Sequence, residues 1–391
     1  MLNIMGDVVL KRVLHPVGQG AFFTEQFFDE KDVPVLNVVY DCGEKNSTKH
    51  LDLEIENTLN PAGSPMEIDL MFFSHLDEDH INGIEHLVRA GCLTRKSVVI
   101  LPLHYPLVVK LMLQYFNSRG VNLFTDSVDE ALYSLFNSEA KILGIGENNE
   151  QIANDPLDLE DGLAGREAYS QISSMQPLKY KSLWNYLPFN TILDNRYQLF
   201  KSNLLAAQID ETKLTDITYV KQHLDKLIDI YKNLPKGIGG VTAINVNSLN
   251  VLSYASKDVK CDGKWVNYFG TPYWWHYLRK DDLVYGSRYS CLYTGDCVME
   301  GHFANCLDFI LKNIVSRIGL LQIPHHGRQS CYNKGIACQK GILAGFTNFN
   351  ATHKANKFVK QIVHDFSMSS RFFYQITEDF HSRLEVYIGL V

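Results

Sequence analysis

The sequence lacks several features that would place it in a specialised class of protein. No apolar stretch is long enough to span a bilayer as a helix, and there is no internal repeat or low-complexity tract. The first residues include an acid and show no basic segment followed by an apolar one, as a secretion signal would. We therefore expect a globular protein in the cytoplasm, without a membrane contact.

Paired cysteines and an excess of positive charge are also missing. The eight cysteines are scattered and form no Cys-x-x-Cys pair, so in a chain of 391 residues we expect reduced thiols rather than a disulfide framework or a zinc ribbon. The 37 Lys and Arg residues are outnumbered by 44 Asp and Glu residues. Net charge therefore gives no global indication of nucleic-acid binding, although it does not report a local basic groove.

The most informative segment present is His-Leu-Asp-Glu-Asp-His at residues 75–80, in which five of six side chains can bind a metal. It follows a short apolar run at 68–73, and residues 81–88 have helical spacing, which predicts a strand-to-helix turn. Burying so many ionisable groups is costly unless a divalent cation compensates them, and mixed imidazole and carboxylate ligands favour Zn²⁺, Mn²⁺ or Fe²⁺. The alternative is a polar helix N-terminus capped by Asp77 or Asp79.

Two later segments have the same order, an apolar strand followed at once by metal-capable side chains. Thr-Gly-Asp at residues 294–296 follows a strand ending at 293, and Pro-His-His-Gly at 324–327 follows a strand ending at 323. Either segment alone is also compatible with an ordinary turn. Because strand ends gather at one edge of an α/β sheet, we expect the three segments to meet in one site.

The chain divides into regions of different secondary-structure pattern. Residues 1–105 alternate β-rich runs with turns and include a strand–helix–strand order, and β character returns after 237, for example at 319–323 and 384–388. Between them, residues 107–116, 128–138 and 221–234 show helical periodicity. We therefore predict one domain formed by 1–105 and 237–391, interrupted by a mostly helical insertion at 106–236.

Taken together, the motifs resemble the metallo-β-lactamase-fold hydrolases, whose leading motif is usually His-x-His-x-Asp-His. Asp77 stands at the second histidine position here, as in the metallo-β-lactamase-like domain of competence-type DNA-uptake channel proteins. Residues 18–20, 40–43, 247–249 and, more weakly, 348–353 are similar to further elements of that branch. The resemblance covers residues 8–104 and 237–391, and it implies an α/β fold with a four-layer αββα sandwich.

The resemblance also implies a set of metal ligands: His75 and Asp77 for one metal, Asp79 and His80 for a second, Asp296 bridging or binding the second, and one of His325 and His326. Asp41 would orient a ligand histidine by accepting a hydrogen bond, and Thr294 would lie beside the ligands. Asn247 is the nearest candidate for the third-motif histidine of the superfamily.

The reaction implied is hydrolysis by a water that one or two Zn²⁺ or Mn²⁺ ions activate. Asp79 would orient that water or accept its proton. His353 would protonate the leaving group, unless it is a surface histidine beside Lys354 and Lys357.

The expected activity is that of a bacterial phosphodiesterase or nuclease, acting on nucleic acid or another phosphodiester. Two alternatives stay open. One is hydrolysis of a small ester, thioester or lactam. The other is a degenerate domain that binds a protein partner through the insertion, as a subunit of a bacterial multi-protein system.

Overall fold

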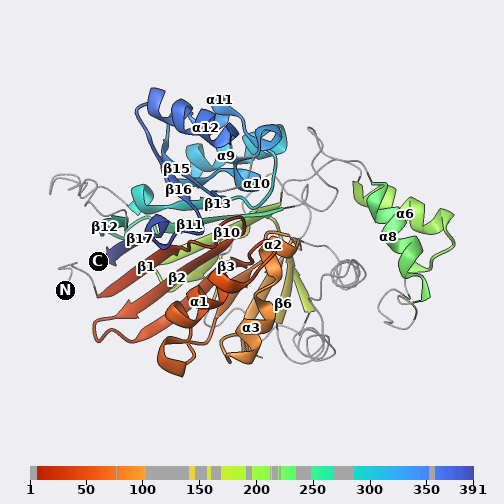
Figure 1. Cartoon of the computed structure of the whole chain (residues 1–391), viewed down its shortest axis with the longest axis horizontal. Helices are drawn as coiled ribbons and strands as arrows, with labels where there is room; N and C mark the ends of the chain where they lie inside the picture. Colours follow the sequence, from red (N-terminus) through yellow and green to blue (C-terminus); the bar gives the residue numbers. More distant parts are fainter. Residues whose placement is uncertain are drawn as a thin grey trace.

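The computed structural model describes residues 7–75, 77–94, 96–102, 141–145, 156–159, 169–190, 196–211, 213, 219, 222–234, 248–267, 286–351 and 357–391. The strands lie in two sheets packed face to face, and helices lie on the two outer sides (Figure 1). The four-layer αββα arrangement expected from the sequence is confirmed. Within these residues, no helix has the length and apolar character needed to cross a membrane.

The first sheet, as far as the structure describes it, has nine strands in the order β12-β17-β1-β2-β3-β4-β5-β6-β8. Its strands from β12 to β3 are antiparallel, and those from β3 to β8 are parallel. The strand bounds are β1 Val8–Leu14, β2 Phe22–Asp29, β3 Pro34–Cys42, β4 Leu70–Phe72, β5 Val98–Leu101, β6 Lys141–Ile145, β8 Tyr169–Ile172, β12 Cys261–Asn267 and β17 Leu384–Leu390.

The second sheet has the order β16-β15-β14-β13-β11-β10-β9-β7 over the same described ranges. Strands β13 to β16 are parallel, while β9, β10, β11 and β13 pair antiparallel. The strand bounds are β7 Leu157–Asp158, β9 Leu178–Tyr180, β10 Trp184–Asn190, β11 Leu249–Ala255, β13 Cys291–Tyr293, β14 Ile318–Gln322, β15 Ile342–Asn348 and β16 Phe372–Ile376.

Helices cover the outer face of each sheet. In Figure 1, α1 and α3 lie against the first sheet and α9 and α12 against the second. The described helices are α1 Lys49–Thr58, α2 Glu78–Ile81, α3 Ile84–Arg89, α6 Arg196–Ala206, α8 Leu224–Lys232, α9 His302–Asn313, α10 Pro324–Gly327, α11 Lys334–Ala337 and α12 Lys357–Met368, with 3₁₀ turns at Pro61–Gly63, Gly286–Tyr289, Gln329–Cys331 and Phe380–Ser382.

The space between the sheets is filled by apolar side chains from both of them. Leu10, Phe23 and Phe72 of the first sheet belong to one buried cluster with Trp184 and Phe346 of the second. Burying a side chain of this size contributes about 1.5–3 kcal/mol relative to exposure. A second cluster joins the outer face of the second sheet to α9 and α12.

A buried carboxylate also ties the two sheets together. Glu25 in β2 accepts hydrogen bonds from the Arg12 guanidinium at 2.6 Å, the Ser253 hydroxyl at 2.7 Å, the Tyr186 hydroxyl at 2.8 Å and the Tyr293 hydroxyl at 2.9 Å. Arg12 is in the first sheet and the three hydroxyls are in the second. Because a buried charge is costly when unpaired, this network favours one relative placement of the sheets.

Residues 106–236 contribute five described strands, β6 to β10, to the two sheets. The sequence pattern did not predict these strands. β10 is buried along its whole length, so it shows no alternation of apolar and polar residues, and Pro188 argues against an inner strand. Pro188 is tolerated because the pairing of β9 covers only Trp184 to Tyr186. α8 agrees with the helical periodicity at 221–234, while 107–116 and 128–138 lie outside the described residues.

The parallel strands place the motif segments at one edge of the sandwich. β3 and β4 in the first sheet, and β13, β14 and β15 in the second, all end where the chain reaches the segments singled out by sequence. The carboxyl ends of parallel strands are the usual location of sites in α/β proteins.

Candidate metal centre

Three tight turns deliver the candidate ligands. The turn between β4 and α2 presents His75, and α2 itself presents Asp79 and His80. After β13, Gly295 has a φ of 54°, and a Cβ there would lie 2.4 Å from the Cβ of Ser74, so only glycine fits. That close approach lets the turn carrying Asp296 reach the first sheet.

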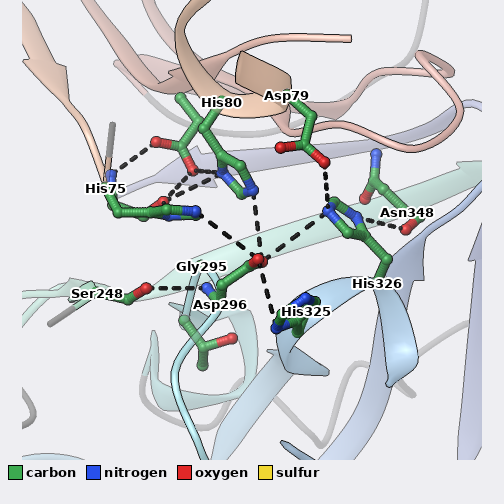
Figure 2. Close-up of polar contacts among 12 residues, drawn as sticks. His75, Asp79, His80, Ser248, Gly295, Asp296, His325, His326 and Asn348 are labelled. Carbon is green, nitrogen blue, oxygen red and sulfur yellow. Dashed lines mark hydrogen bonds and ion pairs between the residues drawn. The ribbon is translucent and has the colours of Figure 1, made fainter. Parts of the chain in front are cut away.

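His325 and His326 follow β14 and both adopt positive φ, at 52° and 53°. Left-handed backbone costs about 1 kcal/mol or more per non-glycine residue. Two such residues in succession are strained, and strain of this kind is typical of functional sites. The backbone places the imidazole of His326 against Asp79, and that of His325 on another side of Asp296 (Figure 2).

Asp296 lies at the centre of the histidine side chains (Figure 2). Its Oδ1 is 3.4 Å from Nε2 of His80 and 3.9 Å from Nε2 of His326, and its Oδ2 is 3.7 Å from Nε2 of His75. Nε2 of His326 is also 3.3 Å from Oδ2 of Asp79. Two donor groups result within the described part of the chain, namely His75 with His80 and Asp296, and Asp79 with His80 and His326.

These distances fit the ligands of a metal better than hydrogen bonds between them. Two ligands of one tetrahedral ion, with bonds of about 2.0–2.1 Å, lie about 3.3–3.4 Å apart. The buried Nε2 atoms of His75, His80 and His326 have no hydrogen-bond partner among the described residues. Buried polar atoms are normally satisfied, so three orphaned nitrogens facing shared carboxylates have the donor pattern of a cation site. The donor set therefore fits the divalent ion that the sequence implies.

Hydrogen bonds to the other ring nitrogens fix the three imidazoles in the same tautomer. Nδ1 of His80 donates to Asp41 at 2.8 Å, and Nδ1 of His326 donates to the backbone carbonyl of Asn348 at 3.0 Å. The Ser74 hydroxyl donates to Asp41 at 2.7 Å and accepts from Nδ1 of His75 at 2.9 Å. With each proton held on Nδ1, every Nε2 lone pair is directed at the centre, as metal binding requires.

His325 also carries its proton on Nδ1, but it turns that nitrogen, not the Nε2 lone pair, towards Asp296. Its Nε2 lies 3.3 Å from Nη1 of Arg328, and a guanidinium can only donate, so Nε2 accepts and the proton is on Nδ1. That Nδ1 faces Oδ2 of Asp296 at 3.5 Å and the thiol of Cys331 at 3.5 Å. Between the two histidines left open by the sequence, the geometry favours His326 as the ligand.

The carboxylates and imidazoles shift each other's pKa. Burial lowers the pKa of His80, but Asp41 and Asp296 outweigh it and raise that pKa well above its usual value. Burial raises the pKa of Asp296, yet the neighbouring histidines His325, His80 and His75 hold it well below the ordinary range. The carboxylates around His80 therefore favour positive charge at this centre, which a bound cation would supply.

Asp77 and His75 lie in less favourable surroundings. Burial and the nearby carboxylates of Asp79 and Asp296 raise the pKa of Asp77 to about 6, and burial together with His80 lowers the pKa of His75 to about 3. Asp77 is half-buried, and it belongs to neither of the donor groups found among the described residues. Without Asp77, the first donor group consists of His75, His80 and Asp296.

The structure thus brings together His75, Asp79, His80, Asp296 and His326, and places His325 and Asp77 at the margin. Thr294 contacts the neighbouring strand end, because its hydroxyl donates to the carbonyl of Gln322 at 3.1 Å. Two predicted residues, Asn247 and His353, lie outside the described residues.

Several supporting residues were assigned no role from the sequence. Ser74 connects His75 to Asp41, and its only sequence signal is its place directly before the first ligand. Ser248 accepts a hydrogen bond from the backbone N–H of Asp296 at 3.1 Å. Asn348 acts through its carbonyl, which no side-chain motif reports.

No family model matches the chain, and no curated protein matches it. Three solved structures are similar at low identity. The first is the metallo-beta-lactamase fold protein YhfI from Bacillus subtilis, with 12% identity and a TM-score of 0.40 over 97% of this chain and 100% of that chain. The second is unliganded yeast PDE1, with 9% identity and a TM-score of 0.45 over 97% of this chain and 99% of that chain. The third is a long form RNase Z from yeast, with 11% identity and a TM-score of 0.29 over 80% of this chain and 32% of that chain. The chain spans 32% of the length of that RNase Z. These values transfer no activity to this chain.

Proposed function

We propose that this chain is a metal-dependent hydrolase that cleaves phosphodiesters, with nucleic acid as the substrate class to test first. The observation that carries the proposal is the donor set of Asp79, His80, Asp296 and His326, in which successive atoms lie 3.3–3.9 Å apart around orphaned Nε2 atoms. The sequence resemblance of Asp77 to the DNA-uptake branch supports a phosphodiester over a lactam.

A bound Zn²⁺ or Mn²⁺ would supply a water of lowered pKa and would neutralise charge that develops on the substrate. The chain's own residues orient the water and the ligand imidazoles. Asp79 has one carboxylate oxygen directed at His326 and is almost fully buried, so it is placed to orient a water or to hold its proton. Asp41 and Asn348 keep the imidazoles of His80 and His326 in the binding tautomer.

The proposal is tested by metal analysis of protein purified without chelators, followed by nuclease and phosphodiesterase assays with Mn²⁺ and Zn²⁺. Asp296→Ala removes the carboxylate that lies between His75, His80 and His326, so we expect loss of bound metal and a fall in activity of about 100-fold or more. Asp258→Ala, at an exposed aspartate, is the matched control. Metal-free wild type, or equal cleavage by wild type and Asp296→Ala, refutes the proposal.

A further inference from the structure

Two cationic side chains lie beside the donor set, one from each half of the sandwich: Lys45 contacts Asp79, and Arg328 contacts the adjoining His325. Lys45 follows the end of β3, and its backbone N–H donates to the carbonyl of Gln19 at 2.8 Å. Its Nζ lies 3.9 Å from Oδ2 of Asp79, and the side chain is 44% exposed. The ammonium group therefore stands at the border between the carboxylate and solvent.

Arg328 takes the corresponding place on the second sheet. It directly follows the positive-φ turn after β14, and its backbone N–H donates to the carbonyl of His325 at 2.9 Å. Its Nη1 lies 3.3 Å from Nε2 of His325, and the residue is exposed. Because the residue is exposed, a ligand in solution can reach the guanidinium.

Stability does not account for the position of these cations. Because the Lys45 ammonium is partly exposed and lies 3.9 Å from Asp79, solvent screens this ion pair, which contributes only about 0–1 kcal/mol. The pKa of Asp79 is lowered, against burial, chiefly by His326 and His80 rather than by Lys45. Arg328 donates its hydrogen bond to a neutral imidazole, so the acceptor does not neutralise the charge of the guanidinium.

A phosphodiester has two non-bridging oxygens that share one negative charge, and guanidinium and ammonium groups are the side chains that bind such oxygens best. A neutral ester or thioester offers a single carbonyl oxygen and no charge. We infer that Lys45 and Arg328 are specificity-determining residues, which bind the non-bridging oxygens of a phosphodiester from two sides of the donor set. This inference rests on the proposed function, because it assigns the substrate charge that the same site recognises.

The test compares metal-loaded wild type with Lys45→Gln, Arg328→Gln and the conservative variant Arg328→Lys. Exposed residues elsewhere provide the matched controls Lys257→Gln and Arg317→Gln. We would measure kcat and KM for a chromogenic phosphodiester and for a neutral chromogenic ester, the binding of dimethyl phosphate by calorimetry, and the metal content of each protein. For each Gln variant we expect a loss of about 10- to 100-fold in kcat/KM for the diester and weaker dimethyl phosphate binding, with ester hydrolysis and metal content unchanged. Arg328→Lys should recover part of the loss.

The outcomes separate this inference from the proposed function. If wild type cleaves the diester and both Gln variants do so equally well, the role assigned to Lys45 and Arg328 is wrong and the hydrolase function stands. If wild type fails to cleave any diester, the proposed function fails. The binding experiment then tests the role of Lys45 and Arg328 by itself, since equal dimethyl phosphate affinity in wild type and both Gln variants overturns that role.

Discussion

Nδ1 of His80 lies 2.8 Å from Oδ2 of Asp41, and neither side chain has any exposed surface. Asp41 also accepts hydrogen bonds from the backbone and the hydroxyl of Ser74, at 2.6 and 2.7 Å. This buried carboxylate therefore sets the orientation of His80 directly and of His75 through Ser74. Asp41, which is not itself a candidate metal ligand, thus aligns two of the three imidazoles.

Replacing Asp41 by Asn should weaken metal binding by about 10- to 100-fold. The amide nitrogen would face Nδ1 of His80 as a donor, which favours the tautomer whose proton is on Nε2 and removes the lone pair from the centre. Competition with a chromogenic chelator measures the affinity for Zn²⁺, and circular dichroism verifies the fold. Asp258→Asn is the control, and an affinity equal to that of wild type would show that Asp41 does not act through His80.

His326→Ala should lose far more metal affinity than His325→Ala. Nε2 of His326 is orphaned beside Asp79 and Asp296, whereas Nε2 of His325 is engaged by Arg328. Removing one ligand of the set should lower affinity by about 10-fold or more, while the His325 variant should stay within about threefold of wild type. Metal titrations of the two variants in parallel make the comparison. The opposite order would assign the ligand to His325.

Gly43→Ala should disrupt the site because the backbone of α2 packs directly on this glycine. A Cβ at Gly43 would lie 2.3 Å from the carbonyl carbon of Asp79 and 2.4 Å from the nitrogen of His80. Backbone cannot yield as a flexible side chain can, so we expect displaced ligands, lost metal binding and a destabilisation of about 1–3 kcal/mol. Gly335→Ala, whose Cβ would meet only a side-chain oxygen at 3.3 Å, should leave both properties nearly unchanged. Urea unfolding and metal content measure the two effects.

His15 should make the protein sensitive to mild acid. Burial lowers the pKa of His15 to about 4, although the hydrogen bond from its Nδ1 to Glu54 opposes this shift. Below pH 6.5 the unfolded chain takes up a proton that the folded chain does not, so stability is complete above that pH and falls towards pH 4, by up to about 3 kcal/mol.

The His15→Gln variant isolates this contribution. Glutamine can still donate to Glu54 and accept from Thr24, the partners of the imidazole at 2.6 and 2.9 Å, but it does not titrate. Urea unfolding of both proteins at pH 7, 6 and 5, with chelator present, should show a shallower loss of stability for the variant. Parallel pH curves would contradict the assignment.

The sequence by itself determined the local elements and the chemistry of the candidate site. The strands that end before His75 and before Asp296 were predictable, because short apolar runs bounded by polar turns are a local signal. The metal-capable residues were predictable because so many ionisable groups at strand ends need compensation. In contrast, β10 reads poorly as a strand, since both of its faces are buried and it contains Pro188.

Only the tertiary structure decided which of these residues work together. The choice between His325 and His326 depends on which ring nitrogen faces the carboxylates, and that is set by Arg328 at Nε2 of His325 and by the Asn348 carbonyl at Nδ1 of His326. The pairing of Asp41 with His80 joins positions 39 residues apart in the chain. Hydrogen bonds between distant residues and the handedness of a two-histidine turn leave no periodic trace in a sequence, because they depend on how the strand ends of the two sheets meet.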